Sequence, residues 1–297
     1  MRSLLKEFDV ISLDETNRLA RMLSRVENKY ILSYEQFDAL LVLIREDYAL
    51  LEIEGRNEFQ YASCYYDDNF SCYNDHHQSR RQRFKARTRE YVNSGLMFFE
   101  IKLKGLRGRT EKYRTDCDTL VMPSVQGTYL TMLSELYSEN YRKEMRLDLT
   151  PSLIVNYSRC TFVSLKGGER VTIDFDLGFD RPYEAGDAVQ VGRDFLVVET
   201  KSIDGRGAAD SALKKMGVRK ASKCSKYCIG ANLTGQVSHN NHFLRNIKRA
   251  KRNIILPNLP RRERRTAPRM APRTAPEKLT GVAVMAPSTE PALAAVR

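Results

Sequence analysis

The stretch from Phe84 to Arg114 constrains the fold most strongly, because it contains three short segments in which charged residues alternate with apolar or small ones. Side chains of a β-strand point to alternate faces. Turn-forming residues at 93–95 and 105–108 separate the segments, which is typical of hairpins. The residues that then share one face are Lys85, Arg87 and Arg89 on the first strand, Glu100, Lys102 and Lys104 on the second, and Lys112 and Arg114 on the third.

A strand face that carries almost only cations is unusual, because neighbouring like charges repel one another. One explanation is an exposed basic face that binds nucleic acid. The other is that the sheet curls until this face lines an interior that holds a polyanion, since interior and exterior residues alternate in a closed sheet. We expect the second arrangement, because other segments of the chain repeat the pattern.

The chain up to residue 235 predicts antiparallel strands with a few helices outside them. Further strands are expected over residues 25–32, 61–68, 152–163, 169–176 and 195–201, and most of them carry charges on one face. In one of these strands, Arg170, Thr172, Asp174 and Asp176 are expected to share a face. Helices are expected near 4–24, 33–44, 125–137 and 208–216, and Ser33 with Gln36 forms a capping-box pattern. The predicted fold class is therefore α+β, an antiparallel β-barrel tunnel with flanking helices.

Positive charge is unevenly distributed along the 297 residues, whose net charge is +12. Residues 236–297 contain 13 Lys and Arg against 3 Asp and Glu, whereas residues 1–235 contain 36 against 34. Seven of the ten prolines also lie beyond residue 236, in a composition that buries no core. We therefore expect an N-terminal helical segment over 1–24, a tunnel domain over 25–235 and a disordered basic tail over 236–297.

Charge alone suggests that this tail binds acidic partners. A nucleic-acid binder is the competing hypothesis, but the tail offers almost no aromatic residue for base stacking, so no sequence-specific nucleic-acid binding is expected. The first 30 residues contain no secretory signal, and no apolar run is long enough to span a membrane. With six scattered cysteines and no Cys-x-x-Cys pair, the chain is expected to be a reduced, cytoplasmic protein. A membrane protein as partner remains compatible with the sequence.

Two other sites are considered and set aside. Cys224 and Cys228 with His239 and His242 form a possible zinc set, but their spacing fits no standard zinc finger. His76 and His77 are expected in a solvated loop rather than as catalytic bases. The mixture of many cations with a few carboxylates in one lumen instead suits a polyphosphate chain with a divalent metal. Arg and Lys would bind phosphate oxygens, and carboxylates would hold Mg²⁺ or Mn²⁺.

The chain resembles the VTC domain, the polyphosphate polymerase module of the triphosphate tunnel metalloenzyme (CYTH-like) superfamily. Nine motifs carry this resemblance between residues 25 and 235, in the order that the family has them. They are Arg-Val-Glu-Asn-Lys-Tyr (25–30), Ser-Cys-Tyr-Tyr-Asp (63–67), Lys-Ala-Arg-Thr-Arg-Glu-Tyr (85–91), Phe-Glu-Ile-Lys-Leu-Lys (99–104), Lys-Tyr-Arg (112–114), Asn-Tyr-Ser-Arg (156–159), Arg-Val-Thr-Ile-Asp (170–174), Val-Val-Glu-Thr-Lys (197–201) and Ser-Lys-Tyr (225–227).

The resemblance implies that the terminal phosphoryl group of ATP is transferred to phosphate or to a growing polyphosphate chain inside the tunnel. The residues that would hold phosphates are Lys29, Arg87, Arg89, Lys102, Lys112, Arg159, Arg170 and Lys226. Glu199 would be the main ligand of Mn²⁺ or Mg²⁺, with Glu27 and Glu100 as further ligands. Asp174 could help to hold the metal, or it could orient a neighbouring cation.

The chain departs from the fungal members of this family. It shows no recognisable inositol-phosphate-sensing (SPX) domain before the tunnel and no transmembrane segments after it, so coupling to membrane translocation is in doubt. Two alternatives stay open at this point. A triphosphatase or polyphosphatase would use the same cations and metal with water as the acceptor. A binding module for polyphosphate or nucleotide would lack catalysis, but it would gain little from Glu199.

Overall fold

The computed structural model describes residues 2–20, 26–105, 110–184, 188–192 and 194–255. The predicted basic tail beyond residue 255, the turn at 106–108 and Arg25 lie outside these ranges. The helices are α1 (Arg2–Leu5), α2 (Leu13–Leu19), α3 (Tyr34–Ile44), α4 (Ser71–His77), α5 (Gly127–Tyr141), α6 (Ala208–Lys215), α7 (Lys226–Leu233), the 3₁₀ helix η1 (Asn241–Phe243) and α8 (Leu244–Arg252). The strands are β1 (Val10–Ile11), β2 (Val26–Leu32), β3 (Tyr48–Leu51), β4 (Phe59–Asp67), β5 (Arg83–Tyr91), β6 (Leu96–Lys104), β7 (Thr110–Asp116), β8 (Thr150–Ser164), β9 (Arg170–Asp180), β10 (Val189–Val191), β11 (Leu196–Ser202) and β12 (Ile254–Ile255).

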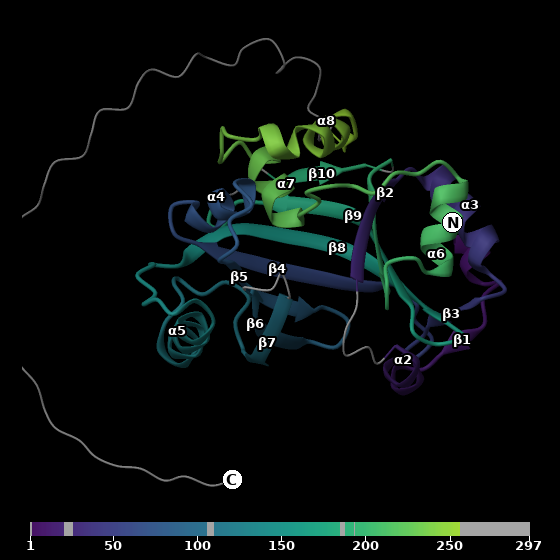
Figure 1. The fold of residues 1–297 in the computed structure, drawn as a ribbon, viewed down its shortest axis with the longest axis horizontal. Coiled ribbons are helices and arrows are strands. Elements are labelled where there is room, and N and C mark those ends of the chain that lie inside the picture. The colour runs from purple at the N-terminus through teal and green to yellow at the C-terminus, as the bar shows by residue number, and fades with distance from the viewer. Residues whose placement is uncertain (1, 21–25, 106–109, 185–187, 193, 256–297) are drawn as a thin grey trace, which may run out of the picture. The chain divides into compact units, whose positions relative to one another are not determined.

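One antiparallel path of strands forms the wall of the molecule, in the order β2-β11-β9-β8-β4-β5-β6-β7. β9 also pairs with β10 beyond the end of β11, and β8 also pairs with β3, which carries β1 in parallel. The sheet curls strongly, with helices outside it and at one end (Figure 1). The predicted antiparallel tunnel sheet with flanking helices is therefore confirmed.

Ion pairs rather than backbone hydrogen bonds connect the two end strands of this path. Within the described part of the chain, no ladder joins β2 to β7. Glu27 of β2 instead lies 3.1 Å from Lys112 of β7 and 3.6 Å from Lys102 of β6. These side chains project from the same face of the sheet, so the contact brings the two edges together across the concave side. Only a curled sheet allows strands at opposite ends of the order to meet in this way.

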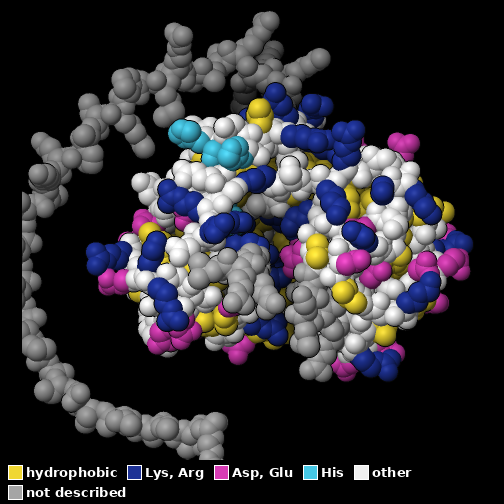
Figure 2. All heavy atoms as spheres, viewed as in Figure 1, with side chains coloured by type: hydrophobic (Ala, Val, Ile, Leu, Met, Phe, Trp, Pro, Cys, Tyr) yellow, Lys and Arg dark blue, Asp and Glu magenta, His cyan; other side chains and the backbone are white. Residues whose placement is uncertain are grey.

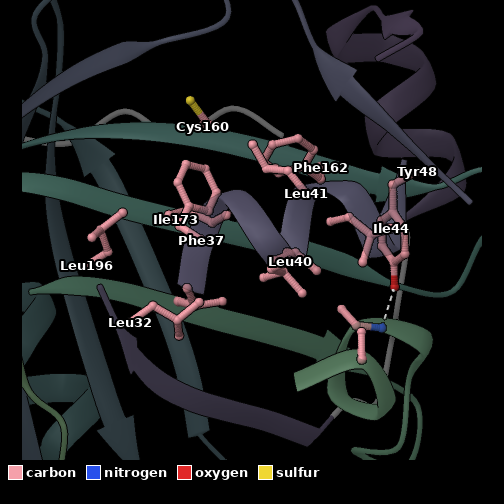
Figure 3. Packing of buried hydrophobic residues seen from close by; sticks show 14 of the residues in the cluster. Leu32, Phe37, Leu40, Leu41, Ile44, Tyr48, Cys160, Phe162, Ile173 and Leu196 are labelled. Atoms are coloured by element: carbon pink, nitrogen blue, oxygen red, sulfur yellow. Dashed lines mark hydrogen bonds between the residues drawn. The ribbon is translucent and has the colours of Figure 1, made fainter. Parts of the chain in front are cut away.

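The convex face behind β2, β9 and β11 is covered by α3 and α6. Ser33 caps α3 and exchanges capping-box hydrogen bonds with Gln36, as predicted. The buried stripe of α3 consists of Phe37, Leu40, Leu41 and Ile44, and Figure 3 shows it packed on strand residues that include Leu32, Phe162, Ile173 and Leu196. At the edge of this cluster, the Tyr48 hydroxyl donates to Glu169 (2.5 Å) and accepts from the Ala209 backbone (3.1 Å), which anchors α6.

A bulge in β9 changes the face that its apolar residues occupy. Ser158 pairs with Phe175 but Asn156 pairs with Gly178, so two residues of β9 oppose one of β8. Asp176 sits at this bulge with φ of 52° and is exposed. The expectation that Asp176 shares a face with Asp174 is therefore wrong. Phe175 packs on the convex side, whereas Leu177 and Phe179 pack on the concave side.

The concave side of β8 and β9 is covered by α7, η1 and α8. Tyr227 and Ile229 of α7, with Phe243 and Ile247, are buried against residues such as Phe179. The expectation of disorder from residue 236 onward is therefore wrong for residues 241–255, because α8 buries an apolar face in this cluster. On the other convex flank, α5 packs over Phe99, Ile101 and Leu103 of β6.

Several short elements carry no periodic signal in the sequence. β3 is buried at all four positions, so it shows no alternation. His76 and His77 lie in α4 instead of the expected loop. The expected helix over 4–24 is replaced by α1 and α2 with β1 between them. No helix in the described ranges has the length and hydropathy that a membrane crossing requires.

Candidate active site

All eleven residues expected at the site project from the concave face of the sheet or reach it from α7. Alternation along each strand places them there, because their neighbours in sequence pack into the convex clusters. The cations on this face are Lys29, Lys85, Arg87, Arg89, Lys102, Lys112, Arg114, Arg159, Arg170, Lys201 and Lys226, and the carboxylates are Glu27, Glu100, Asp174 and Glu199. Positive charge therefore exceeds negative charge on this surface.

Glu199 lies at the centre of the first charged cluster. Its Oε2 contacts the Lys29 ammonium, and its Oε1 lies 2.6 Å from the Lys201 ammonium. Burial would raise the pKa of Glu199, but Lys29 and Lys201 outweigh it and hold the pKa well below the ordinary value. The carboxylate is thus ionised, although its side chain is only 14% exposed.

Glu27 is the nearest second carboxylate and comes from the adjacent strand. Lys201 pairs with Glu27 across the ladder and Glu199 pairs with Lys29, so Glu27 and Glu199 lie diagonally on one face. Burial and Glu199 would raise the pKa of Glu27, but Lys102, Lys112 and Lys201 lower it to about 2. Two ionised carboxylates therefore project together toward the space between β2 and β6.

Glu27 and Glu199 supply part of the ligand set that one hard divalent cation needs. Mg²⁺ and Mn²⁺ prefer oxygen ligands, and Mg²⁺ in phosphoryl-transfer sites is bound through one or two carboxylates with the remaining positions taken by water and phosphate oxygens. The described residues contain no group of three or more His, Cys, Asp or Glu that would enclose a metal by itself. Glu199 and Glu27 would therefore hold such an ion only together with a bound phosphate.

Glu100 has a different environment from Glu199. Its Oε2 accepts from Arg87 Nε (2.7 Å) and Nη2 (2.5 Å), and Arg89 lies 3.8 Å away. Burial opposes ionisation, but Arg87 and Arg89 lower the pKa of Glu100 to about 2. The forked contact fixes the Arg87 guanidinium, whose Nη1 also donates to Tyr65 (2.7 Å). This geometry favours Glu100 as an orienting partner of Arg87 rather than as a metal ligand.

Asp174 orients a third group of cations. Arg159 donates through Nε to Oδ1 (2.5 Å) and through Nη2 to Oδ2 (2.9 Å), and Lys226 of α7 contacts Oδ2. Asp174 is 1% exposed, so its oxygens are surrounded by protein. Of the two roles expected for Asp174, this contact set matches orientation of cations.

Sequence reasoning missed an aromatic layer beneath the arginines. The rings of Tyr61 and Tyr157 stack 5.2 Å apart at 6°, and Arg89 lies 5.4 Å from the Tyr61 ring centre. Arg159 lies 5.4 Å from the Tyr157 ring centre. Cation–π contacts hold the guanidinium planes in place while leaving their N–H groups available. The sequence pattern that could have indicated this layer is the two-residue spacing of Tyr61, Ser63 and Tyr65, which places these side chains together on the charged face.

Lys201 and Lys85 also lie on the charged face, although the family resemblance does not assign them to the site. Lys201 follows Glu199 by two residues, so alternation alone would have placed it beside that carboxylate. Burial lowers the pKa of Lys201 to about 8 even though Glu199 opposes the shift. Lys85 Nζ donates to Ser225 Oγ (2.9 Å), which joins β5 to the start of α7.

Lys102 of this face also has a lowered pKa. Burial lowers its pKa to about 7, with Lys112 and Lys85 adding to the shift and Glu27 opposing it. Lys102 is therefore close to half protonated near neutral pH, and a bound anion would favour its charged form.

A cleft of about 360 Å³ leads from the surface to this face. It is lined by Glu27, Lys29, His76, Ser79, Arg83, Lys85, Ala221, Lys223, Cys224, Ser225 and Phe243. Figure 2 shows a hollow with dark-blue side chains around it. Among the charged lining residues, Lys29, Arg83, Lys85 and Lys223 outnumber the carboxylate Glu27. Since Lys29 and Lys85 belong to the concave face as well, the cleft is an opening of the tunnel.

The zinc set considered from the sequence does not assemble. Cys224 and Cys228 are buried and are free thiols, and burial raises the pKa of each. His242 Nδ1 donates to the His77 carbonyl (2.5 Å), and the two imidazole rings stack 4.6 Å apart. Stacked histidines bonded in this way serve packing between α4 and η1.

Comparison with known proteins finds distant structural similarities and one family match. No curated protein matches the sequence. A putative adenylyl cyclase from Hippeastrum, described as having a dominant triphosphatase activity, is 12% identical with a TM-score of 0.43, covering 73% of this chain and 99% of its own. Pyrococcus horikoshii PH1819 is 14% identical with a TM-score of 0.37 (70% and 97% covered). A putative adenylate cyclase from Vibrio parahaemolyticus is 15% identical with a TM-score of 0.35 (69% and 97% covered).

A family model gives a more specific result than these distant folds. The model of the VTC domain matches residues 24–234, which include every strand from β2 to β11 and all of α7. The matched range also contains each residue of the charged concave face. The chain therefore belongs to the VTC domain family.

Proposed function

We propose that this protein is a polyphosphate polymerase that transfers the terminal phosphoryl group of ATP to phosphate or to the end of a polyphosphate chain. The observation that carries this proposal is the concave face, on which ordered arginines and lysines surround the ionised pair Glu27 and Glu199. Membership in the VTC family supports it. In the reaction, the bond between the γ-phosphorus and the β–γ bridging oxygen breaks, ADP leaves, and a new bond forms to an oxygen of the acceptor phosphate.

The residues of this face would act mainly by binding and orientation. Arg87, Arg89 and Arg159 present guanidinium groups that are already fixed by carboxylates or tyrosine rings, so less entropy is lost when they bind phosphate. Lys29 and Lys226 now contact carboxylates and would exchange part of that contact for phosphate oxygens. These fixed cations would stabilise the charge that spreads over the transferred group.

Glu199 and Glu27 would hold Mn²⁺ or Mg²⁺ on the phosphates. Such an ion would supply positive charge that offsets the negative charge developing on the transferred phosphoryl group. The carboxylates themselves contribute negative charge that attracts the cation into an otherwise basic surface. A site that only bound polyanions would gain little from these two side chains.

Incubation of purified protein with ATP and Mn²⁺ or Mg²⁺, with and without phosphate or pyrophosphate as primer, tests the proposal. Products are resolved on a gel that separates polyphosphate by length, and ADP is measured in parallel. We expect a ladder or smear of polyphosphate with ADP released. Free phosphate without chains would instead identify a triphosphatase, and neither product with tight polyphosphate binding would identify a binding module.

A further inference from the structure

The segment that follows α6 differs in charge from the rest of the folded chain. Residues 211–255 contain 11 Lys and Arg and no Asp or Glu, whereas residues 1–210 contain 30 and 34. Lys226 is the one of these cations that reaches Asp174 in the charged concave face. The others therefore need a different explanation, because a folded surface normally mixes both signs.

Packing fixes which way these cations point. Phe243, Ile247 and Ala250 are buried in the cluster under α7 and α8, so the opposite face of α8 is turned outward. Arg245, Lys248, Lys251 and Arg252 are exposed on that outer face. Figure 2 shows dark-blue side chains gathered in the region where Figure 1 places α8.

The loop before α7 lies beside α8 along one edge of β2. Ala221 N donates to the Lys29 carbonyl (2.7 Å), and Arg249 Nη1 donates to the Ile31 carbonyl (2.8 Å). Asn246 Nδ2 of α8 donates to the Ser222 carbonyl of the loop (2.9 Å). The exposed cations of the loop and of α8 therefore form one surface, the basic strip, which consists of Arg219, Lys220, Lys223, Arg245, Lys248, Lys251 and Arg252.

The basic strip begins at the rim of the cleft. Lys223 is exposed and also lines the cleft, beside Lys29 and Lys85 of the tunnel wall. Outside residues 211–255, Asp194 is a carboxylate that acts on Arg249 of α8. A flexible polyanion that leaves the cleft at Lys223 would therefore continue along α8 over cations that no side chain of residues 211–255 can neutralise.

We propose that the basic strip is a second binding site, outside the tunnel, for linear polyphosphate of a length that exceeds the tunnel. Evenly exposed Lys and Arg suit a flexible chain with one charge or more per phosphate, and release of counterions would drive the binding. The two segments that carry the strip, residues 219–223 and 244–252, contain no aromatic residue on which a nucleobase could stack, so a nucleic acid fits this surface less well. The identity of the ligand rests on the proposed function, but its binding can be measured without turnover.

The test compares long-chain polyphosphate with tripolyphosphate, which is short enough for the tunnel alone. The strip variant carries Arg245→Gln, Lys248→Gln, Lys251→Gln and Arg252→Gln. The control variant carries Lys6→Gln, Arg18→Gln, Arg56→Gln and Lys143→Gln, which removes the same charge from exposed positions on other elements. Affinities of the full chain are measured by calorimetry at several salt concentrations.

We expect the strip variant to bind long polyphosphate about tenfold more weakly or worse at moderate salt, with a shallower salt dependence. Its affinity for tripolyphosphate should equal that of the wild type, and the control variant should bind both ligands normally. Equal weakening in the control variant, or equal weakening for tripolyphosphate, would overturn the inference. So would tighter wild-type binding of single-stranded RNA or of anionic vesicles through the same four residues.

Catalysis provides a readout that separates this inference from the proposed function. If the protein makes polyphosphate, the strip variant should release shorter chains at an unchanged initial rate of ADP formation. If the protein makes none, the proposed function fails, yet the length-dependent binding of added polyphosphate still decides whether the strip is a site.

Discussion

At the scale of single residues, Glu199 and Glu100 show how two ionised carboxylates in one basic surface acquire different roles. Glu199 contacts two lysines, whose flexible ammonium groups can move to a phosphate and leave carboxylate oxygens for a cation. Glu100 is held by the planar fork of Arg87, which leaves its Oε2 engaged. The type of cationic partner therefore separates a candidate metal ligand from an orienting group.

We predict that Glu199→Gln lowers turnover by about 100-fold or more, the order seen when one group that stabilises transition-state charge is removed. Tripolyphosphate affinity should stay within a few-fold of the wild type, because Lys29 and Lys201 remain. Rates and calorimetry check both parts. Glu100→Gln is the comparison, and it should leave the Mn²⁺ concentration for half-maximal rate unchanged. Normal turnover in Glu199→Gln would show that the metal is held elsewhere.

We also predict that polyphosphate affinity falls as pH rises from 6 to 9. The pKa of Lys102 is about 7 and that of Lys201 is about 8, so both lose their charge over this range in the free protein. A bound anion raises both values, and binding therefore takes up protons at pH 8. Calorimetry in buffers of different ionisation enthalpy measures this uptake. The variant Lys102→Arg stays charged over the whole pH range, so its polyphosphate affinity should depend less on pH than that of the wild type. An unchanged pH profile of the affinity would exclude Lys102 as the source of the pH dependence.

At the scale of elements, the β9 bulge and α7 together divide the concave face into a charged half and an apolar half. The bulge turns Leu177 and Phe179 inward, and α7 packs over them. Gly230 allows this close approach, because a Cβ there would meet Phe179 and would lie 2.6 Å from Leu153. The helix in turn places Lys226 on Asp174 at its first residue.

We predict that Gly230→Ala displaces α7 and weakens both stability and phosphate binding. Overpacking of this kind typically costs about 1–3 kcal/mol of unfolding free energy. The affinity for tripolyphosphate should fall as well as the stability, because the displacement of α7 also moves Lys226. Denaturant unfolding and calorimetry measure the two effects. Gly217→Ala serves as control for a glycine with nothing near its Cβ, although its positive φ adds local strain. Wild-type values for both properties in Gly230→Ala would show that α7 is not fixed by this contact.

At the scale of the whole molecule, the folded unit extends to the end of α8, beyond the last residue of the family match at 234. Phe243, Ile247 and Ala250 complete the core under α7. A boundary drawn from composition at residue 235 would remove them. The segment after residue 236 is rich in Lys and Arg, yet it contains a helix that is needed for packing.

We predict that a chain ending at residue 255 melts like the full-length protein, whereas one ending at 239 melts several degrees lower. Losing the burial of Phe243 alone is expected to cost about 3–5 kcal/mol. Thermal melts followed by circular dichroism compare the two truncations. The variant Phe243→Ala in the full chain separates the effect of lost packing from the effect of the positive charges that the truncation removes. Equal melting temperatures for both truncations would show that α8 contributes nothing to the core.

The sequence by itself determined the alternation that makes one face of each strand charged. It also determined the capping of α3 and the order of motifs that marks the VTC family. The direction of side chains in a strand and the position where a helix starts both depend on residues that are close in sequence. The sequence therefore predicts the charged residues of β5, β6 and β11. It does not predict their individual contacts, because these contacts join strands that are far apart along the chain.

Only the tertiary structure decided which cations meet which carboxylates. The contact of Glu27 with Lys112 requires the sheet to curl until β2 approaches β7, and no local pattern encodes that meeting. The same holds for the stacked Tyr61 and Tyr157, and for the core role of α8. Local residues fix local geometry, whereas the curvature of the sheet is set by all its strands and by the helices packed on it.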